Sequence, residues 1–279
     1  MASRRGARVR SWSVGRILLY AVLGLLVAVA TMLVTAPASL VDLALERATD
    51  GRVRLADATG SIWNGQGRVV LVDVATIANR DQQAVAPRGP ISLPGVVIPG
   101  TIRWEIAALP LVIGRLQASA SHESMAKPAL ITGTASRLQV TGGSLQLPNV
   151  NLARLGSPWT TVRPTASLAV TWQPIVIEDG RFNGQAILEL RDVASALTPV
   201  RPLGAYRIDI DGSGATSVIR MSSLDGPLRL SGQGTWTPAA GLRFTAYAEA
   251  DEAERLRLQS LLGLLGRREG TRTMIKIGA

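Results

Sequence analysis

Hydrophobic and polar residues alternate with a period of two through much of the chain that follows residue 50. Alternation of this kind is typical of β-strands with one buried face. Glycine and proline, with 28 and 15 copies, lie mostly between the alternating runs, where turns are expected. The pattern therefore predicts a mainly β protein built on a twisted antiparallel sheet, with a few short helices. The clearest alternating runs are GRVRLADATG (51–60), GQGRVVLVDVATI (65–77), TIRWEIAAL (101–109), GAYRIDI (204–210) and GPLRLSGQGTW (226–236).

Residues 251–265, DEAERLRLQSLLGLL, have helical periodicity instead. Acidic residues lie at the start of this stretch and two arginines follow its end, as the helix dipole favours. Gly266 stands where a glycine commonly ends a helix. The sequence therefore predicts a helix whose apolar stripe is formed by Leu258, Leu261, Leu262 and Leu265.

Two pairs of segments far apart in the chain resemble each other. EDGRFNGQAILELRDVASAL (178–197) aligns with DATGSIWNGQGRVVLVDVA (57–75), and GAYRIDI (204–210) is similar to GTIRWEI (100–106). Two matches in the same order favour a duplicated β unit. The alternative is chance similarity between glycine-rich strands.

Glycine-rich segments that join or flank the strands are candidates for structural corners. In GSIWNG (60–65), two glycines give the backbone freedom to reverse, and Trp63 can fold its ring onto the edge of the core. Similar residues recur in the aligned segment and in SGQGTW (231–236). The corner candidates are Gly60, Trp63, Gly65, Gly184, Gly232, Gly234 and Trp236.

Residues 17–36, ILLYAVLGLLVAVATMLVTA, contain no charged side chain. As a helix this run would be roughly 30 Å long, which is the thickness of the hydrocarbon core of a bilayer. Five arginines precede it, and acidic residues outnumber basic ones just after it. The positive-inside rule then predicts a cytoplasmic N-terminus and an exported body.

A cleaved signal peptide is the alternative for the same segment. Ala36-Pro37-Ala38 has the small residues of a cleavage site, but its central proline is unfavourable. The apolar run also exceeds the core of about 7 to 15 residues that signal peptides have. We therefore expect an uncleaved anchor. The expected organisation is a basic cytoplasmic tail (1–16), a transmembrane helix (17–36) and an exported β-rich domain (37–279), which the repeat would divide into halves 37–148 and 149–279.

The residues that usually carry chemistry are scarce. The chain has no cysteine, which excludes a thiolate nucleophile and a zinc–cysteine site, and its one histidine, His122, lies in a polar segment. DIDGSG (209–214) begins like a calcium loop, but its twelfth position is Arg220 and not a carboxylate. Glu178 and Asp179 are adjacent and would point to opposite faces of a strand. We therefore expect no enzymatic activity, no cofactor and no metal site.

The net charge of +10 comes almost entirely from arginine. Outside the N-terminal tail the arginines are scattered among acids, so the sequence does not predict a nucleic-acid-binding face. Arg267 and Arg268 form the most concentrated basic feature of the exported part. They are candidates for contact with an acidic partner or with lipid phosphates, and the alternative is a solvated helix end.

The chain resembles protein N of the bacterial type II secretion system, also called general secretion pathway protein N. The resemblance implies a single-pass protein of the bacterial inner membrane with a periplasmic β-rich domain, in the machinery that exports folded proteins from the periplasm. It brings no catalytic or cofactor residues. Residues 79–97 and 118–130 do not contribute to it. The segments that carry it are APASLVDLAL, RVRLADATGSIWNG, PLGAYRIDI, GPLRLSGQGTW and LLGLLGRREGTRTMIKIG.

Two functions agree with these features. The first is a scaffold that contacts other secretion subunits through exposed strand edges or the C-terminal helix. The second is a periplasmic module that binds phospholipid or another hydrophobic molecule on an uncovered apolar face of the sheet. The two differ in whether the helix at 251–265 covers the inner face of the strands.

Overall fold

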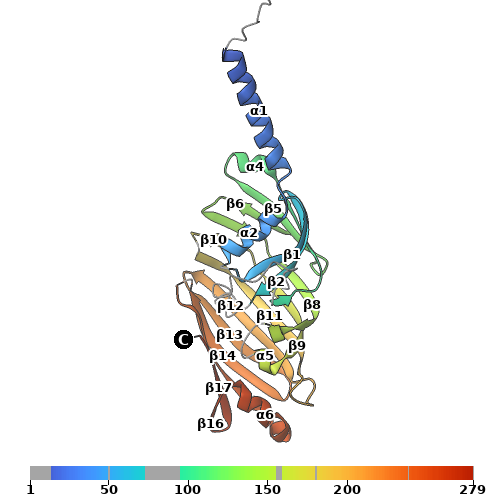
Figure 1. Ribbon diagram of the computed structural model, residues 1–279. Coiled ribbons are helices and arrows are strands. Elements are labelled where there is room, and N and C mark those ends of the chain that lie inside the picture. The colour runs from blue at the N-terminus through green and yellow to red at the C-terminus, as the bar shows by residue number, and fades with distance from the viewer. Residues whose placement is uncertain are drawn as a thin grey trace, which may run out of the picture.

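The structure of the protein, a computed structural model, describes residues 14–49, 51–72, 95–154, 159–179, 181–237 and 239–278. In this part of the chain, seventeen strands form one antiparallel sheet, and the helices after the first are short. Figure 1 shows that the sheet is strongly twisted and that α1 projects from one end of it. The predicted mainly β fold is therefore confirmed.

The helices and strands have the following bounds. The helices are α1 (Val14–Val34), α2 (Ser39–Ala48), α4 (Ala108–Val112), α5 (Trp159–Val162) and α6 (Arg255–Leu265), with the 3-10 turns η1 (Leu152–Arg154) and η2 (Glu252–Glu254). The strands are β1 (Val53–Gly60), β2 (Asn64–Val72), β3 (Gly95–Val97), β4 (Ile102–Ile106), β5 (Leu116–His122), β6 (Ala129–Gly133), β7 (Arg137–Val140), β8 (Gly143–Asn151), β9 (Pro164–Trp172), β10 (Ile175–Glu178), β11 (Arg181–Ser195), β12 (Gly204–Gly214), β13 (Ser217–Asp225), β14 (Leu228–Thr237), β15 (Gly241–Ala250), β16 (Arg267–Glu269) and β17 (Arg272–Ile277). Most of the predicted basic tail, together with residues 73–94, lies outside the described residues.

The long strand β11 joins two arms of the sheet. One of its edges pairs first with β10 and then with β9, and its other edge pairs with β12. From β10, the first arm runs through β7, β6, β5, β4 and β2 to β1. From β12, the second arm runs through β13, β14, β15 and β17 to β16. β8 adds to β9, so β1, β8 and β16 lie at edges of the sheet.

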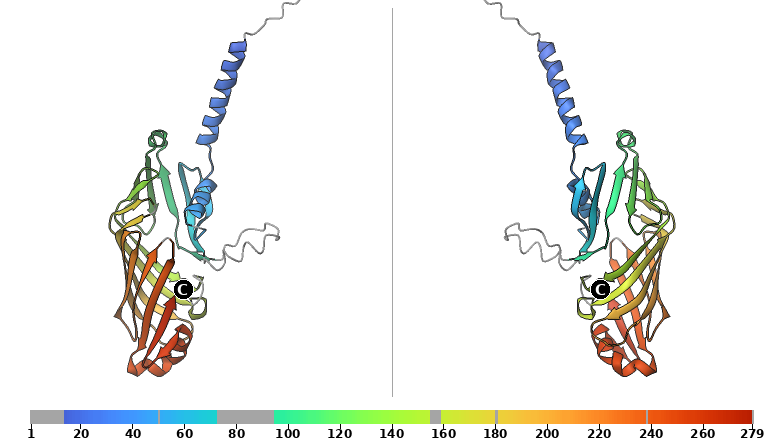
Figure 2. Two further views of the ribbon diagram at one scale, coloured as in Figure 1. Left: turned by 90° about the vertical axis from the view of Figure 1, so that its left-hand side faces the viewer. Right: turned by 90° about the vertical axis from the view of Figure 1, so that its right-hand side faces the viewer.

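Three clusters of buried side chains hold the curved sheet together. Leu258 and Leu261 of α6 lie in the first cluster, against β12, β14 and β15. α2 covers the second cluster, around Leu55 of β1. In the third cluster, Val96 of β3 packs on Leu147 of β8, so the first arm also meets the β8–β9 pair. Figure 2 shows α2 near the end of the body from which α1 emerges and α6 at the opposite end.

α1 occupies nearly the same segment as the predicted transmembrane helix at 17–36. Its described large side chains are exposed, among them Leu18, Leu23 and Met32. Several other side chains of this helix lie outside the described residues. Within what the structure describes, none of the helices combines the length and the apolarity that crossing a bilayer requires. The helix is therefore present, but the prediction that it spans a membrane is not confirmed.

α6 lies where the sequence predicts a helix, and the first part of the predicted segment forms the separate 3-10 turn η2. Leu258 and Leu261 are its buried side chains, as the apolar stripe indicates. Gly266 does follow the last residue of the helix, but it does not have the left-handed conformation of a helix-ending glycine. Its φ of 176° is extended. A Cβ at this position would lie 2.1 Å from the carbonyl oxygen of Met274. Glycine is therefore required by the close approach of β17.

Several glycines lie inside strands, where they make room for an aromatic ring on the neighbouring strand. Gly65 of β2 is directly opposite Trp104 of β4, and a Cβ on this glycine would lie 2.4 Å from ring carbon Cζ2. An aromatic ring that covers a glycine compensates for the missing side chain of that strand. The same arrangement joins Trp172 to Gly143 and Phe244 to Gly234, and the Phe182 ring covers Gly212 from a diagonal position. The glycine content therefore serves packing as well as turns.

The segments that resemble each other share their connectivity. β1 and β2 form a hairpin whose second strand pairs with β4, and β10 and β11 form one whose second strand pairs with β12. Their registers differ, because Asn64 pairs with Glu105 whereas the aligned Asn183 pairs with Ser213. In the sequence match Glu105 aligns with Asp209, so an identical register would pair Asn183 with Asp209. The observed partner is Ser213, which shifts the register by four residues. The division into halves at 148 and 149 stays a prediction.

Candidate functional site

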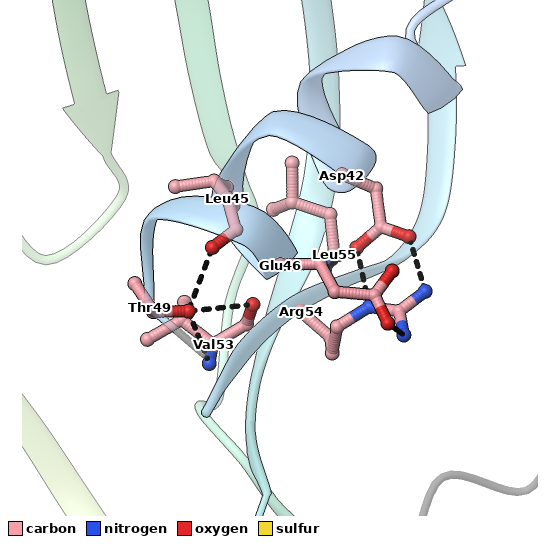
Figure 3. Close-up of polar contacts among 7 residues, drawn as sticks. All are labelled: Asp42, Leu45, Glu46, Thr49, Val53, Arg54 and Leu55. Atoms are coloured by element: carbon pink, nitrogen blue, oxygen red, sulfur yellow. Dashed lines mark hydrogen bonds and ion pairs between the residues drawn. The ribbon is translucent and has the colours of Figure 1, made fainter. Parts of the chain in front are cut away.

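The free edge of β1 is covered by side chains of α2 and of Thr49, the residue that follows it (Figure 3). The backbone N–H of Leu55 donates to Asp42 Oδ1 at 2.7 Å. The backbone N–H of Val53 donates to Thr49 Oγ1 at 3.0 Å, and the hydroxyl of Thr49 donates to the Leu45 carbonyl at 2.7 Å. These are the outward-facing donors that a further strand would need. α2 therefore blocks pairing of another chain along this edge.

A salt-bridge network fixes α2 in that position. Arg54 of β1 donates from Nε to Asp42 Oδ1 at 3.0 Å and from Nη2 to Oδ2 at 2.7 Å, and its Nη1 lies 2.9 Å from Glu46. Burial alone would raise the pKa of Asp42, but the hydrogen bonds from Arg54 and from the Leu55 N–H outweigh it and hold this pKa below its usual value. The same hydrogen bond to Asp42 raises the pKa of Arg54, against the opposing effect of burial. The pair therefore stabilises the covered edge when both groups are charged.

Asp42→Asn should lower the free energy of unfolding by about 2 kcal/mol at pH 7, because charged hydrogen bonds to a partly buried group are lost. The pKa of Asp42 is depressed in the folded protein, so its contribution is present above the unfolded value near 3.8 and is lost as pH falls through the lower, folded value. The difference between wild type and variant should therefore shrink below about pH 4. Urea unfolding of the full chain in mild detergent, followed by circular dichroism at several pH values, measures this.

Asp57→Asn is the matched control, because Asp57 pairs with Arg68 on the exposed surface. Its effect should stay within about 0.5 kcal/mol. An equal loss of stability in both variants would show that the Asp42 pair has no special role at the edge of β1.

The edges of β8 and β16 are also poor sites for strand addition. The edge of β8 contains Pro148, which has no N–H to donate, and a bulge between Leu147 and Val150. Its first part is occupied by the connection between β5 and β6, since the N–H of Gln146 donates to the Ser124 carbonyl. β16 has only three residues, all exposed and all charged. Short, charged edges of this kind disfavour pairing with another strand.

A pocket lies between α6 and β16, at the end of the body opposite α1. Its volume is about 370 Å³, and its lining residues include Arg255, Leu256, Leu262 and Arg268. The side chain of Leu256 is 86% exposed. Arg268 Nε donates to the Gly270 carbonyl at 3.1 Å, which holds its guanidinium beside the pocket. This pocket combines exposed apolar surface with positive charge.

The structure separates the two arginines that the sequence singles out. Both lie on β16, but Arg267 pairs with Met274 and Arg268 with Thr273, so their side chains point to opposite faces. Arg268 therefore faces α6 and the pocket. Arg267 is on the outer face, and it forms no ion pair with any residue that the structure describes.

The corner candidates fall into two groups. Three lie at the connection of β1 to β2: Gly60 with a φ of 93°, Trp63, which is half-buried, and Gly65 under the Trp104 ring. The others lie inside β11 and β14 and not at chain reversals: Gly184, Gly232, Gly234 and Trp236. The sequence therefore located glycines that matter for packing, but it did not show that the ring over Gly65 is that of Trp104.

The one histidine belongs to the local structure of a turn. His122 ends β5, its Nδ1 accepts the N–H of Ser124 at 3.0 Å, and its Nε2 lies 3.0 Å from the Pro99 carbonyl. The first contact assigns the ring proton to Nε2, which donates to Pro99. Among the described residues there is no group of three or more His, Cys, Asp or Glu side chains that could hold a metal ion.

A family model for protein N of the type II secretion system matches residues 51–275. The chain belongs to this family. Comparison with curated proteins and with solved structures gives no match. The match to the family extends from β1 into β17 and so includes β1 and the pocket of α6, whereas α2, which covers the edge of β1, precedes it. Membership makes the chain a component of a protein secretion system, associated with the cell envelope and with other subunits of that system.

Proposed function

We propose that the protein is a non-catalytic contact component of the type II secretion system, attached to the bacterial inner membrane by α1. The observation that carries this proposal is the placement of two different surfaces at opposite ends of one sheet (Figure 2). The exposed apolar side chains of α1 lie at one end, and the basic pocket of α6 lies at the other. Such a body can hold a partner at a fixed distance from the membrane.

The proposed orientation has the N-terminus in the cytoplasm and the sheet in the periplasm. Its support is the charge distribution around residues 17–36, with five arginines before the apolar run and more acids than bases just after it. α2 and β1 begin shortly after α1, so the body would start close to the outer surface of the inner membrane. From there it can reach proteins that pass through the periplasm.

We propose the pocket between α6 and β16 as the contact site for another secretion subunit. Leu256 provides an exposed apolar anchor, and Arg255 and Arg268 favour an acidic segment of the partner. The blocked edges of β1 and β8 argue against docking by strand addition. Of the two docking modes considered for a scaffold, strand edges and the C-terminal helix, this leaves docking through α6. Arg267 would add a contact with the same partner from the outer face of β16.

Site-specific cross-linking tests this contact, since the chain has no cysteine and any introduced thiol is unique. In the native cell, the variant Leu256→Cys should cross-link to another secretion subunit through a short thiol-reactive reagent. The additional changes Arg255→Glu and Arg268→Glu should reduce that product at least tenfold. Leu224→Cys, at an exposed leucine of β13, is the control and should give no such product. Equal amounts of cross-linked product from both cysteine variants, or no product from Leu256→Cys, would contradict the proposal.

A second candidate function, binding of phospholipid or another hydrophobic molecule, is supported by the inner face of the sheet. α6 covers this face only at one end, around Tyr206 and Leu228. Ile208 and Ile210 follow Tyr206 on the same face of β12, and both are only partly buried. Leu188 and Ile219 on the adjacent strands are also partly buried, and none of these four belongs to a buried cluster. Co-purifying phospholipid in native mass spectrometry would favour this function.

A further inference from the structure

The connection between β4 and β5 forms an exposed apolar tip. It consists of α4 and Ile113, and the exposed fractions of Leu109, Val112 and Ile113 are 84%, 85% and 71%. Single exposed apolar side chains are ordinary on protein surfaces. Three large ones within five positions, together with Leu111 at 39%, form a concentrated patch and call for a partner.

The second half of this tip is closed by hydrogen bonds of its own backbone. The N–H groups of Ile113 and Arg115 donate to the Pro110 carbonyl, at 3.2 Å and 2.9 Å, and that of Gly114 donates to the Leu111 carbonyl at 3.0 Å. Gly114 has a φ of 72°, which lets the chain reverse within a few residues. A closed turn of this kind loses little when water is removed from around it. Its backbone is therefore suited to an apolar environment.

The tip lies at the end of the body from which α1 emerges (Figures 1 and 2). The exposed apolar side chains of α1 and those of α4 therefore belong to the same end of the molecule. Any membrane that holds α1 would lie close to the tip. A partner at the opposite end, such as one bound at α6, would not reach it.

The charge of the tip fits a membrane surface. Residues 106–117 contain no acidic side chain, and Arg115 is their single charged residue and is exposed. Arginine at the edge of an apolar patch can extend its guanidinium to lipid phosphates while its stem stays among apolar groups. A shallow concavity of about 500 Å³ beside it is lined by Leu109, Ile113 and Leu116.

We propose that the α4 tip inserts into the interfacial region of the lipid bilayer beside α1, with Arg115 at the level of the phosphates. This inference rests on the proposed attachment of α1 to the membrane. The tip would be a second point of contact with the membrane, in addition to α1. Two points of contact restrict the tilt of the body relative to the membrane, whereas α1 alone would leave the body free to tilt. The pocket of α6 would then be held away from the membrane surface.

Depth-dependent fluorescence quenching tests the insertion. The full chain is reconstituted in phosphatidylethanolamine–phosphatidylglycerol vesicles, with one environment-sensitive fluorophore at Val112→Cys, Leu23→Cys or Leu256→Cys. We expect a blue-shifted emission at Val112→Cys and at least twofold quenching by lipids with a nitroxide near the headgroup. Leu23→Cys in α1 should be quenched by a nitroxide deeper in the acyl chain, and Leu256→Cys by neither lipid.

The outcomes separate the two proposals. Quenching at Leu23→Cys without quenching at Val112→Cys would overturn the insertion of the tip and leave the attachment of α1 intact. No quenching at either position would contradict both. A blue shift at Val112→Cys without lipid quenching would mean contact with protein, and would also overturn the assignment to lipid.

Discussion

Leu258→Ala should lower the free energy of unfolding by about 2 to 5 kcal/mol, the largest change that we expect from a single substitution in this chain. Leu258 has an exposed fraction of 0%, and it packs with Leu261 in the cluster that joins α6 to the sheet. Truncation removes buried apolar contacts and leaves a cavity that the surrounding strands cannot fill completely. Urea unfolding of the full chain in mild detergent, followed by circular dichroism, measures the loss.

The same helix provides the control. Leu256→Ala makes the same chemical change two residues earlier, at a side chain that is 86% exposed. Its effect on the free energy of unfolding should stay within about 0.5 kcal/mol. Similar effects of the two substitutions would show that α6 is not docked on the sheet, and the pocket that it forms with β16 would lose its basis.

The contrast between the two leucines also has a functional consequence. Leu258 fixes the helix and Leu256 is free to meet a partner, so the first substitution should affect stability and the second should affect contact. Leu256→Ala should therefore weaken secretion in the native cell without lowering the amount of folded protein. This separation is available because the helix presents different faces to the sheet and to solvent.

The periodicity of the sequence was sufficient to predict many of the strands and the last helix, although strands such as β5 and β9 were not among the predicted runs. In β17, Thr273, Ile275 and Ile277 alternate with polar or longer residues, and all three lie opposite β15 residues of the inner face. Such local patterns are readable because strand and helix periods depend on neighbouring residues alone. The order of the strands follows in part from the same fact, since most consecutive strands pair as neighbours.

Contacts between distant residues were not predictable in this way. The sequence indicates Trp63 as the ring at the first corner, whereas the buried ring is Trp104 of β4, which lies opposite Gly65. Nothing in the local pattern around Gly65 shows which strand will pair with it. The covering of β1 by Asp42 is a similar case, because its carboxylate lies 13 positions before the N–H that it accepts.

The candidate contact surfaces could be predicted from the sequence only in part. Arg267 and Arg268 are adjacent and basic in the sequence, but the strand they form sends one to the pocket and the other to the outer face. The sequence predicts a buried turn or short helix at LPLVIGRL (109–116); the short helix α4 is present there, but it is exposed. An apolar run such as LPLVI has no feature that separates burial from exposure. Exposure depends on what packs against a segment, and this requires the fold.

Gly65→Ala should lower the free energy of unfolding by about 2 kcal/mol, the cost typical of overpacking a filled site. The new methyl group would meet the ring of Trp104 at 2.4 Å and the carbonyl oxygen of Thr59 at 2.8 Å. The second contact is with backbone of the paired strand β1, which cannot move without disturbing the hairpin. Gly263→Ala, in α6 with no atom within 4 Å of the new methyl, should instead add about 0.5 to 1 kcal/mol.

A double-mutant cycle with Trp104→Leu identifies the cause of the loss. If the ring is the obstacle, Gly65→Ala should cost at least 0.5 kcal/mol less in the Trp104→Leu background, roughly the smallest coupling expected between residues in contact. The indole nitrogen of Trp104 is buried and has no hydrogen-bond partner among the described residues, so its ring is held there by packing alone. Strictly additive effects of the two substitutions would show that the glycine at position 65 serves the backbone of the hairpin and not the aromatic ring across from it.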